Sequence, residues 1–416
     1  MSILIKDVLL DGKETSIYIE GNSIAGIEGN SQADETIDGR GMAALPGLIN
    51  THSHAAMTLF RGYGDDMKLQ QWLEEKIWPI EGKLTEEDVY WGAKLACLEM
   101  IKSGTTSFND MYWHLPGTVR AVEEMGIRAV LSPVFIDLFD EHKRKGVIKE
   151  HTKLLNDVKA KGSERIMPAL GPHALYTVSK EGLQWCKEFA EKKNLLIHFH
   201  LAETEQENKD CVEKNGKRPV EYLEEIGFLC DRIVAAHCNW LNGKDMKILA
   251  KHGVNIAHNP ASNMKLATGV MPYPEMVKAG LTVSLGTDGC ASNNSLDMFE
   301  EMKFAALLQK SARNDPTAMP AGEAWKMATI SGARALGLNA GVIKEGMLAD
   351  IMLVNLKKVG LAPSHNLISN LVYSANGSCV DTVICNGRIL MQERRVESED
   401  EIIQKASEVA MNLAQR

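Results

Sequence analysis

The chain has 416 residues, of which 44% are hydrophobic and 24% are charged, and its formal net charge is −9. This composition is typical of a soluble globular protein with a sizeable core, and the acidic balance argues against a nucleic acid or an anionic membrane as a partner. The N-terminus holds no apolar run long enough for a signal peptide, and no later segment approaches a membrane span. Eight scattered cysteines without a C-x-x-C pair predict reduced thiols and a cytoplasmic protein.

The two ends of the chain share one sequence pattern, in which short β-prone runs alternate with turns. Residues 1–47 alternate short β-prone runs with turns such as Asp11-Gly12, and similar runs flank Asn386-Gly387 in residues 343–416. These are hairpin signals. We therefore expect both ends to build one small β-sandwich, followed by a C-terminal helix from Glu399 to Gln415.

The central segment, residues 48–342, alternates apolar strand-like runs with helix-like runs. Thr85 opens one of these helices with a capping-box pattern, and Ser179 is the expected N-cap of another. Eight such alternations predict an α/β fold, a TIM-like (β/α)₈ barrel. The expected strands end near polar residues, namely His54, Asp110, Asp137, His173, His200, His237, Asn259 and Asp288. Active sites of this fold lie at the carboxyl ends of the strands, so the pattern predicts a catalytic site there.

Three of these positions, together with His52, form a candidate metal site. His52 and His54 are two residues apart on one strand, so both imidazoles point to the same side. With His200 and Asp288 they give one Zn²⁺ or similar divalent ion four protein ligands and leave a position for water. The metal would lower the pKa of that water towards about 7. His237 is expected close enough to form a hydrogen bond with the water.

Two neighbours of His200 need separate interpretation. His198 shares a face of the strand with His200 but lies deeper, so we interpret it as a core histidine. Glu203 follows just beyond the strand, where a carboxylate could contact both the water and a substrate. The alternative for Glu203 is a solvated loop residue, and the residues before it favour the catalytic interpretation.

Several motifs match a known superfamily in order. They are Pro46-Gly47-x-Ile49-x-x-His52-x-His54, His200-x-x-Glu203, His237, Thr287-Asp288 and Gly346-x-x-Ala349-Asp350. On these motifs the chain resembles the amidohydrolase superfamily over essentially its full length. Members with two metals supply a lysine or glutamate at the end of the fourth strand. Here that strand ends with Gly171-Pro172-His173-Ala174, which implies one metal.

Further motifs indicate a particular family within the superfamily. They are Trp78-Pro79-x-Glu81, Gly171-Pro172-His173-Ala174-x-Tyr176-Thr177, His200-Leu201-Ala202-Glu203-Thr204 and Asn259-Pro260-x-Ser262-Asn263-x-Lys265. They resemble the 5-methylthioadenosine/S-adenosylhomocysteine deaminase family, including archaeal 5′-deoxyadenosine deaminases. The resemblance implies that Glu81 binds the ribose hydroxyls, that His173 also contacts the nucleoside, and that the chain is a homo-oligomer. From the residues alone, Glu81 is an ordinary loop carboxylate.

The reaction implied by the resemblance is hydrolytic deamination of an adenine ring in a salvage step. The substrates would be 5′-deoxyadenosine, 5′-methylthioadenosine, S-adenosylhomocysteine or adenosine, and the products an inosine-type nucleoside and ammonia. Activated water attacks C6, Asp288 accepts its proton, Glu203 protonates N1, and His237 orients the water. The sequence leaves open the 5′ group and the native metal, because these ligands also suit Fe, Mn or Ni.

Other functions compete with this one. Guanine or cytosine deaminases and triazine chlorohydrolases would share the metal site, but a bare base or a triazine has no ribose for Glu81 to hold. A non-catalytic scaffold would be expected to have lost metal ligands, and a dihydroorotase-type hydrolase would need the bridging lysine. Among the charged residues 141–145, a basic side chain such as Arg144 could meet the carboxylate of a homocysteine tail.

Overall fold

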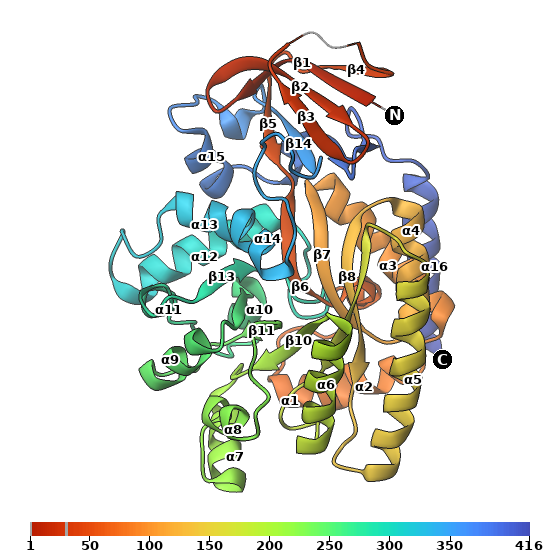
Figure 1. The fold of residues 1–416 in the computed structure, drawn as a ribbon, viewed down its shortest axis with the longest axis vertical. Coiled ribbons are helices and arrows are strands. Elements are labelled where there is room, and N and C mark those ends of the chain that lie inside the picture. Colours follow the sequence, from red (N-terminus) through yellow and green to blue (C-terminus); the bar gives the residue numbers. More distant parts are fainter. Residues whose placement is uncertain (1, 30–31) are drawn as a thin grey trace.

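The computed structural model describes residues 2–29 and 32–416 and contains two sheets (Figure 1). The first is a barrel of eight parallel strands in sequence order, which confirms the predicted fold class. Each polar strand end named above lies within three residues of an observed strand end. The strands are β6 (Leu48–Ser53), β7 (Thr105–Tyr112), β8 (Arg128–Phe135), β9 (Ile166–Pro172), β10 (Leu196–Leu201), β11 (Ile233–His237), β12 (Asn255–His258) and β13 (Thr282–Leu285).

Side chains carry much of the seam between the first and last barrel strands. The Thr51 hydroxyl donates to the backbone oxygen of Leu285 at 2.8 Å, and the Asn50 amide donates to the Thr287 hydroxyl at 2.7 Å. A backbone bond from the Asp288 N–H to the His52 oxygen, at 3.0 Å, continues the seam into the site. The seam therefore fixes β6 and β13 side by side.

Helices surround the barrel. The predicted capping box is present, because the Asp88 N–H bonds to the Thr85 hydroxyl at 3.3 Å and the Thr85 N–H to the Asp88 carboxylate at 2.9 Å. Ser179 caps the next predicted helix through the Gly182 N–H at 3.1 Å. The helices are α3 (Glu86–Lys102), α4 (Leu115–Met125), α5 (Glu141–Ala160), α6 (Lys180–Lys193), α7 (Glu205–Asn215), α8 (Pro219–Glu225), α9 (Gly243–Lys251), α10 (Pro260–Lys265), α11 (Tyr273–Lys278), α12 (Met298–Arg313), α13 (Ala321–Met327) and α14 (Ile330–Leu336).

The connection after β6 is a set of short helices that reaches over the carboxyl end of the barrel. They are η1 (Ala55–Phe60), α1 (Leu69–Trp72), the π-helical η2 (Leu73–Ile77) and α2 (Trp78–Glu81). π-helical turns inside helices are frequent at functional sites.

The second sheet unites the two ends of the chain in the order β16-β15-β14-β5-β1-β2-β3, with β4 beside β1. Its hairpins turn at Asp11-Gly12 and Asn386-Gly387, as predicted. The sheet is mixed, because β1 pairs in parallel with β4 and β5. The strands are β1 (Ser2–Leu10), β2 (Lys13–Glu20), β3 (Ser23–Ile27), β4 (Glu35–Asp38), β5 (Met42–Pro46), β14 (Ile351–Asn355), β15 (Val380–Cys385) and β16 (Arg388–Met391).

A buried ion pair joins the two sheets. The Arg128 guanidinium, at the start of β8, donates to both carboxylate oxygens of Asp350 at 2.9 and 3.2 Å. Both side chains are 2% exposed. In Figure 1 the terminal sheet lies at the end of the barrel where β6, β7 and β8 begin, so this pair lies far from the strand ends that carry the site.

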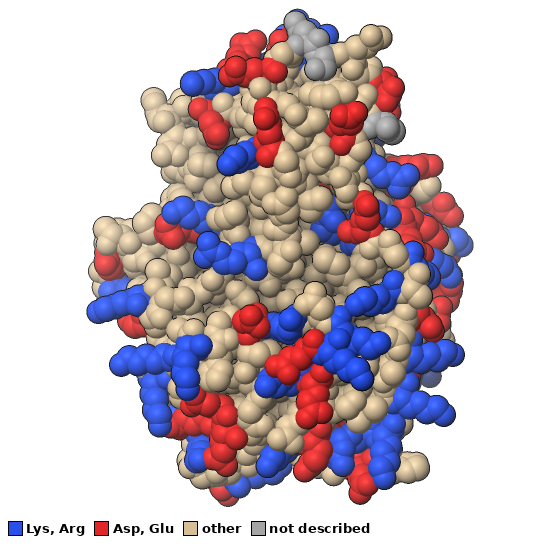
Figure 2. Space-filling view, in the orientation of Figure 1, with Lys and Arg blue, Asp and Glu red and all other residues tan. Residues whose placement is uncertain are grey.

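The remaining helices cover the outside. The predicted C-terminal helix is observed as α16 (Glu399–Gln415), and it packs on α3. The others are η3 (Val359–Leu361), α15 (Leu367–Tyr373) and η4 (Gly377–Cys379). Acidic and basic side chains are intermixed on the face drawn in Figure 2. Among the described residues, no helix is both long and apolar enough to cross a membrane.

Candidate metal centre and nucleoside site

A cavity opens at the carboxyl ends of the barrel strands, and the predicted site residues converge on it. His52 lies fully buried beside it. The lining includes His54, Glu81, His173, His200, Glu203, His237 and Asp288. These side chains come from β6, α2 and the ends of β9, β10, β11 and β13.

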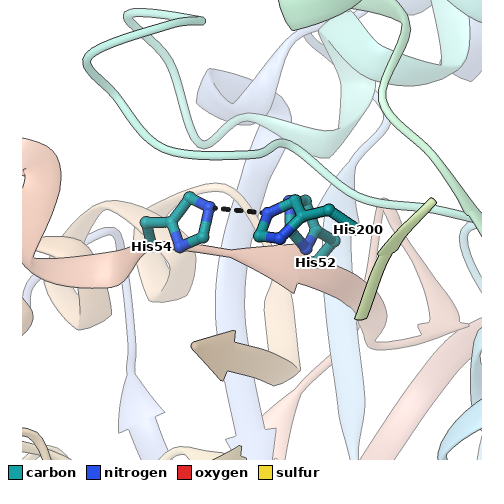
Figure 3. Close-up of side chains that lie close together, drawn as sticks. All are labelled: His52, His54 and His200. Atoms are coloured by element: carbon teal, nitrogen blue, oxygen red, sulfur yellow. Dashed lines mark hydrogen bonds between the residues drawn. The ribbon is translucent and has the colours of Figure 1, made fainter. Parts of the chain in front are cut away.

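The histidine tautomers favour a bound cation. Nδ1 of His54 lies 2.7 Å from the backbone oxygen of Met111, and Nδ1 of His200 lies 2.9 Å from the backbone oxygen of His173. A carbonyl only accepts, so each Nδ1 carries a hydrogen and each Nε2 presents a lone pair. The two Nε2 atoms are 3.3 Å apart, as drawn in Figure 3, where His52 lies next to His200. Two facing lone pairs repel each other, and a shared cation removes that repulsion.

Asp288 completes this cluster. Its Oδ1 lies 3.2 Å from Nε2 of His52 and 3.3 Å from Nε2 of His54. Burial alone would raise the pKa of this carboxyl, but the contact with His52 and the other nearby histidines hold it well below its usual range. The Ser262 and Ser292 hydroxyls donate to Oδ2 at 2.6 and 3.1 Å. Imidazole nitrogens and a carboxylate oxygen are suitable ligands for Zn²⁺.

His237 faces the same cluster from β11. One ligand atom each of His52, His237 and Asp288 lie within 4.8 Å of one another. Nδ1 of His237 lies 2.9 Å from the side-chain oxygen of Asn263. Burial lowers the pKa of His237, but the carboxylates of Glu203 and Asp288 outweigh that effect and raise it overall. His237 therefore combines a fixed ring orientation with an enhanced tendency to hold a proton.

Glu203 lies across the cavity with its Oε2 3.9 Å from Nε2 of His237. Its backbone is fixed by the Glu207 carboxylate, which accepts from the Glu203 N–H at 2.9 Å, and by the Asn239 amide at 3.0 Å. Burial raises the pKa of the Glu203 carboxyl, and Asp288 adds to that shift. The side chain can therefore stay protonated at a higher pH than an exposed glutamate.

The backbone beside these groups is strained. Ala202, His237 and Asp288 have positive φ angles of 48°, 70° and 62°. Such conformations are uncommon outside glycine and cluster at functional sites. His237 and Asp288 line the cavity, and Ala202 directly precedes Glu203, which also lines it.

Two of the polar residues predicted at strand ends accept hydrogen bonds from backbone N–H groups and do not contribute to the cavity. Asp110 accepts from the Ala55 N–H at 2.6 Å and so holds the turn after His54. Asp137 accepts from the N–H groups of Phe139 and Ser179 at 3.0 and 2.9 Å. Neither carboxylate lines the cavity.

His198 contacts the cluster from beneath. Its Nε2 lies 2.5 Å from Nδ1 of His52, and both rings are fully buried. The sequence predicts a core histidine here; His198 is indeed buried, and it also contacts a candidate ligand. No local pattern indicates this pairing, because the two residues are 146 positions apart.

Glu81 reaches the cavity from α2, where Tyr112 and Trp113 lie beside its carboxyl. Burial raises the pKa of Glu81, while the contact with Tyr112 lowers it. His173 lines the same cavity, with Nδ1 2.9 Å from the Thr177 hydroxyl. Tyr112 and Trp113 are not among the site residues predicted from the sequence. The one indication in the sequence is that they follow shortly after Asp110 at a predicted strand end.

Arg144 lies away from the cavity. Its guanidinium donates to the Ser179 hydroxyl at 3.2 Å and lies 3.7 Å from Glu181. It is not among the residues that line the cavity. The suggested contact of Arg144 with a substrate tail therefore has no support in the geometry.

Residues 43–390 match the amidohydrolase family. The chain belongs to this family. The match confirms the resemblance inferred from the motifs and spans the whole barrel together with β5, β14, β15 and most of β16 in the terminal sheet.

Individual relatives of this amidohydrolase carry deaminase names. The 5′-deoxyadenosine deaminase of Methanoregula boonei is 51% identical, over 99% of this chain and 92% of that protein. The 5-methylthioadenosine/S-adenosylhomocysteine deaminase 1 of Archaeoglobus fulgidus is 50% identical, over 96% of this chain and 95% of that protein. These relatives confirm the finer resemblance as well.

Solved structures agree on the fold. An adenosine deaminase from Xanthomonas campestris with bound zinc has a TM-score of 0.94 and 30% identity, covering 100% of this chain and 99% of that one. An atrazine chlorohydrolase from Arthrobacter aurescens complexed with zinc has a TM-score of 0.90 and 25% identity, covering 98% and 100%.

Proposed function

We propose that this amidohydrolase hydrolytically deaminates the adenine ring of 5′-substituted adenosines. The observation that supports the proposal is that Glu81 lines the same cavity as the His-Asp cluster, because a carboxylate there could accept from two ribose hydroxyls next to a centre for hydrolysis. Relatives about half identical over nearly the whole chain are named for this chemistry.

The residues present fit one divalent metal, which we propose to be Zn²⁺. His52, His54, His200 and Asp288 would hold it, since the Nε2 lone pairs of His54 and His200 face each other and the Asp288 carboxylate lies 3.2 and 3.3 Å from Nε2 of His52 and His54. When bound, such a metal supplies a water of lowered pKa and a positive charge at the reacting atom. The end of β9 offers His173 and no lysine or glutamate, which supports a single ion.

Glu203 is the proposed proton donor to ring N1. Its raised pKa keeps the acid form available, and protonating N1 makes C6 more electrophilic as negative charge moves onto the ring. His237 would orient the attacking water and stabilise the tetrahedral adduct at C6 through its Nε2.

Asp288 is the proposed acceptor of the proton from water. Its low pKa keeps the carboxylate ionised, and Ser262 and Ser292 hold Oδ2 in place. Asp288 then passes this proton to the exocyclic nitrogen, Glu203 takes the hydroxyl proton of the adduct as the C6 carbonyl forms, and ammonia leaves. Glu81 would bind the ribose hydroxyls, with His173 as a second contact to the nucleoside.

A substrate panel on the zinc-loaded protein tests the proposal. Loss of adenine absorbance would be followed with 5′-deoxyadenosine, 5′-methylthioadenosine, S-adenosylhomocysteine and adenosine, beside adenine, guanine and cytosine. We expect turnover of nucleosides and not of bases, lost in Glu203→Gln. The matched control is Glu205→Gln, because Glu205 lies on the same segment but pairs with Lys209 on the surface. Turnover of bases alone would contradict the role of Glu81.

Triazine hydrolysis is a second candidate, favoured by the close structural likeness to the atrazine chlorohydrolase. The lower identity and the presence of Glu81 favour the nucleoside. Adding atrazine to the panel decides between them: release of chloride without turnover of nucleosides would replace the first proposal.

A further inference from the structure

Two consecutive residues of α10 contact two of the groups proposed to act in the reaction. The Ser262 hydroxyl donates to Oδ2 of Asp288 at 2.6 Å, and the side-chain oxygen of Asn263 lies 2.9 Å from Nδ1 of His237. Asn263 is 1% exposed and does not line the cavity, so its amide meets neither bulk water nor a substrate. Its partners are therefore other residues of the protein.

A buried chain of hydrogen bonds leads from Asn263 to the backbone of Glu203. The Asn263 amide nitrogen donates to the side-chain oxygen of Asn239 at 2.8 Å, and the Asn239 amide nitrogen donates to the backbone oxygen of Glu203 at 3.0 Å. Thr268 lies beside this chain, with its hydroxyl 3.3 Å from the Asn239 nitrogen and 3.4 Å from the Asn263 oxygen. Both asparagines and His237 are buried, so the chain is shielded from solvent.

The carbonyl of Glu203 determines the direction of every bond in this chain. A backbone oxygen only accepts, so the Asn239 amide turns its nitrogen towards Glu203 and its oxygen towards Asn263. Asn263 must then use its nitrogen as the donor to Asn239 and present its oxygen to His237. That oxygen accepts from Nδ1 of His237, which therefore carries a hydrogen. Nε2 is left facing the carboxylates of Glu203 and Asp288, at 3.9 and 4.0 Å.

We propose that Asn263 is a positioning residue that sets the tautomer and ring orientation of His237, and that Asn239 orients Asn263 for this purpose. The inference rests on the proposed function, because that function assigns the attacking water to His237. The opposite tautomer would aim the Nδ1 lone pair at the Asn263 oxygen, and two acceptors that face each other in a buried site are unfavourable. Since Nδ1 keeps its hydrogen, Nε2 is the ring nitrogen that forms the hydrogen bond with the water.

NMR of the ¹⁵N-histidine-labelled protein, recorded with and without zinc, reads the tautomer directly. The His237 signals are assigned by their loss in His237→Gln, at alkaline pH, where the neutral ring predominates. We expect a hydrogen on Nδ1 in the wild type and a mixture of both tautomers in Asn263→Leu. Asn239→Leu should also give the mixture, because the Asn263 amide can then turn over, even though Asn239 lies one residue further along the chain of hydrogen bonds.

Kinetics of the zinc-loaded protein with 5′-deoxyadenosine test the consequence for the reaction. Asn263→Leu should lower kcat about 100-fold or more and change KM little, since His237 acts on the water. Asn263→Asp keeps an oxygen that accepts from Nδ1, so it should restore the Nδ1–H tautomer and much of kcat. The matched control is Asn208→Leu, which removes another buried amide near the site, one that donates to the backbone oxygen of Trp240 at 2.9 Å. This control should leave the tautomer and kcat unchanged.

The outcomes separate this inference from the deaminase proposal. A wild-type His237 with its hydrogen on Nε2 would overturn the inference even if the leucine variants failed to fold. An unchanged tautomer in folded Asn263→Leu, or a shifted tautomer with kcat intact, would overturn it as well. If the tautomer shifts as expected but no nucleoside is turned over by the wild type, Asn263 sets the tautomer of His237 and the deaminase proposal is wrong.

Discussion

Nδ1 of His52 and Nε2 of His198 lie 2.5 Å apart, with their rings nearly perpendicular at 89°. If His52 binds a metal through Nε2, its Nδ1 must carry the hydrogen, and His198 accepts it. Such an outer contact fixes the tautomer and orientation of a metal-binding histidine. His198 is thus a positioning residue for the proposed metal centre.

Replacing His198 should weaken metal binding without unfolding the protein. His198→Phe removes the acceptor, and zinc affinity should fall by about 10–100-fold. His198→Gln keeps an acceptor and should restore part of that loss. Chelator competition measures the affinity, and circular dichroism of the metal-free variants checks the fold. Equal zinc affinity in the Phe variant would contradict the positioning role.

Removing the metal should lower thermal stability. A ligand that binds only the folded state stabilises it by about 2.7 kcal/mol at 100 times its Kd. We therefore expect the Tm in calorimetry to fall on chelation and to return with zinc. His54→Ala removes a ligand and should make the Tm insensitive to zinc. A wild-type Tm that changes neither on chelation nor on addition of zinc would show that the cluster holds no metal.

Glu81→Gln should affect nucleoside binding more than chemistry. The neutral amide is a weaker acceptor for two ribose hydroxyls, so KM for 5′-deoxyadenosine should rise about tenfold or more while kcat changes less. Glu75→Gln, on the exposed face of the same helical segment, is the control. A loss confined to kcat would place Glu81 in the chemistry instead.

The ion pair between Arg128 and Asp350 should be essential for stability. Asp350→Asn leaves a buried guanidinium without its carboxylate, which typically costs about 3–5 kcal/mol of the free energy of unfolding. Asp38→Asn, which breaks an exposed pair with Arg40 in the terminal sheet, should have no measurable effect. Urea denaturation compares the two, and similar small effects would show that the buried pair contributes little.

Acid should destabilise the fold partly through His151. Burial lowers the pKa of this histidine to about 4, and its ring packs edge-on against Phe135. Below its ordinary pKa of about 6.5, the unfolded chain takes up a proton that the folded state refuses, so stability falls as the pH drops from about 6.5 to 4. This histidine accounts for up to about 3 kcal/mol of that loss.

The variant His151→Gln isolates this contribution. The difference in unfolding free energy between pH 7 and pH 4.5 should shrink relative to wild type, because glutamine does not titrate in that range. His142→Gln, on the exposed start of the same helix, is the matched control for the substitution. An identical pH slope in all three proteins would contradict the buried neutral state.

Much of the barrel could be predicted because its signals are local. The apolar run of β11 and the capping box at Thr85 each depend on a few neighbouring residues. The strand-end polar residues were likewise visible, since a closed barrel brings all carboxyl ends together. Contacts between distant segments were not predictable. The pairing of His198 with His52, and the separation of Arg144 from the cavity, depend on side-chain directions that no local pattern encodes.

The seam between β6 and β13 has a consequence for the motions of the protein. His52 lies in the first barrel strand, His54 directly follows it, and Asp288 follows the last strand. The proposed metal would therefore link two strands that side-chain hydrogen bonds otherwise hold together. Loss of the ion would then be coupled to local separation of β6 from β13. We expect the backbone amides of residues 50–53 and 284–288 to exchange their hydrogens with solvent faster in the metal-free protein than those of the central strands.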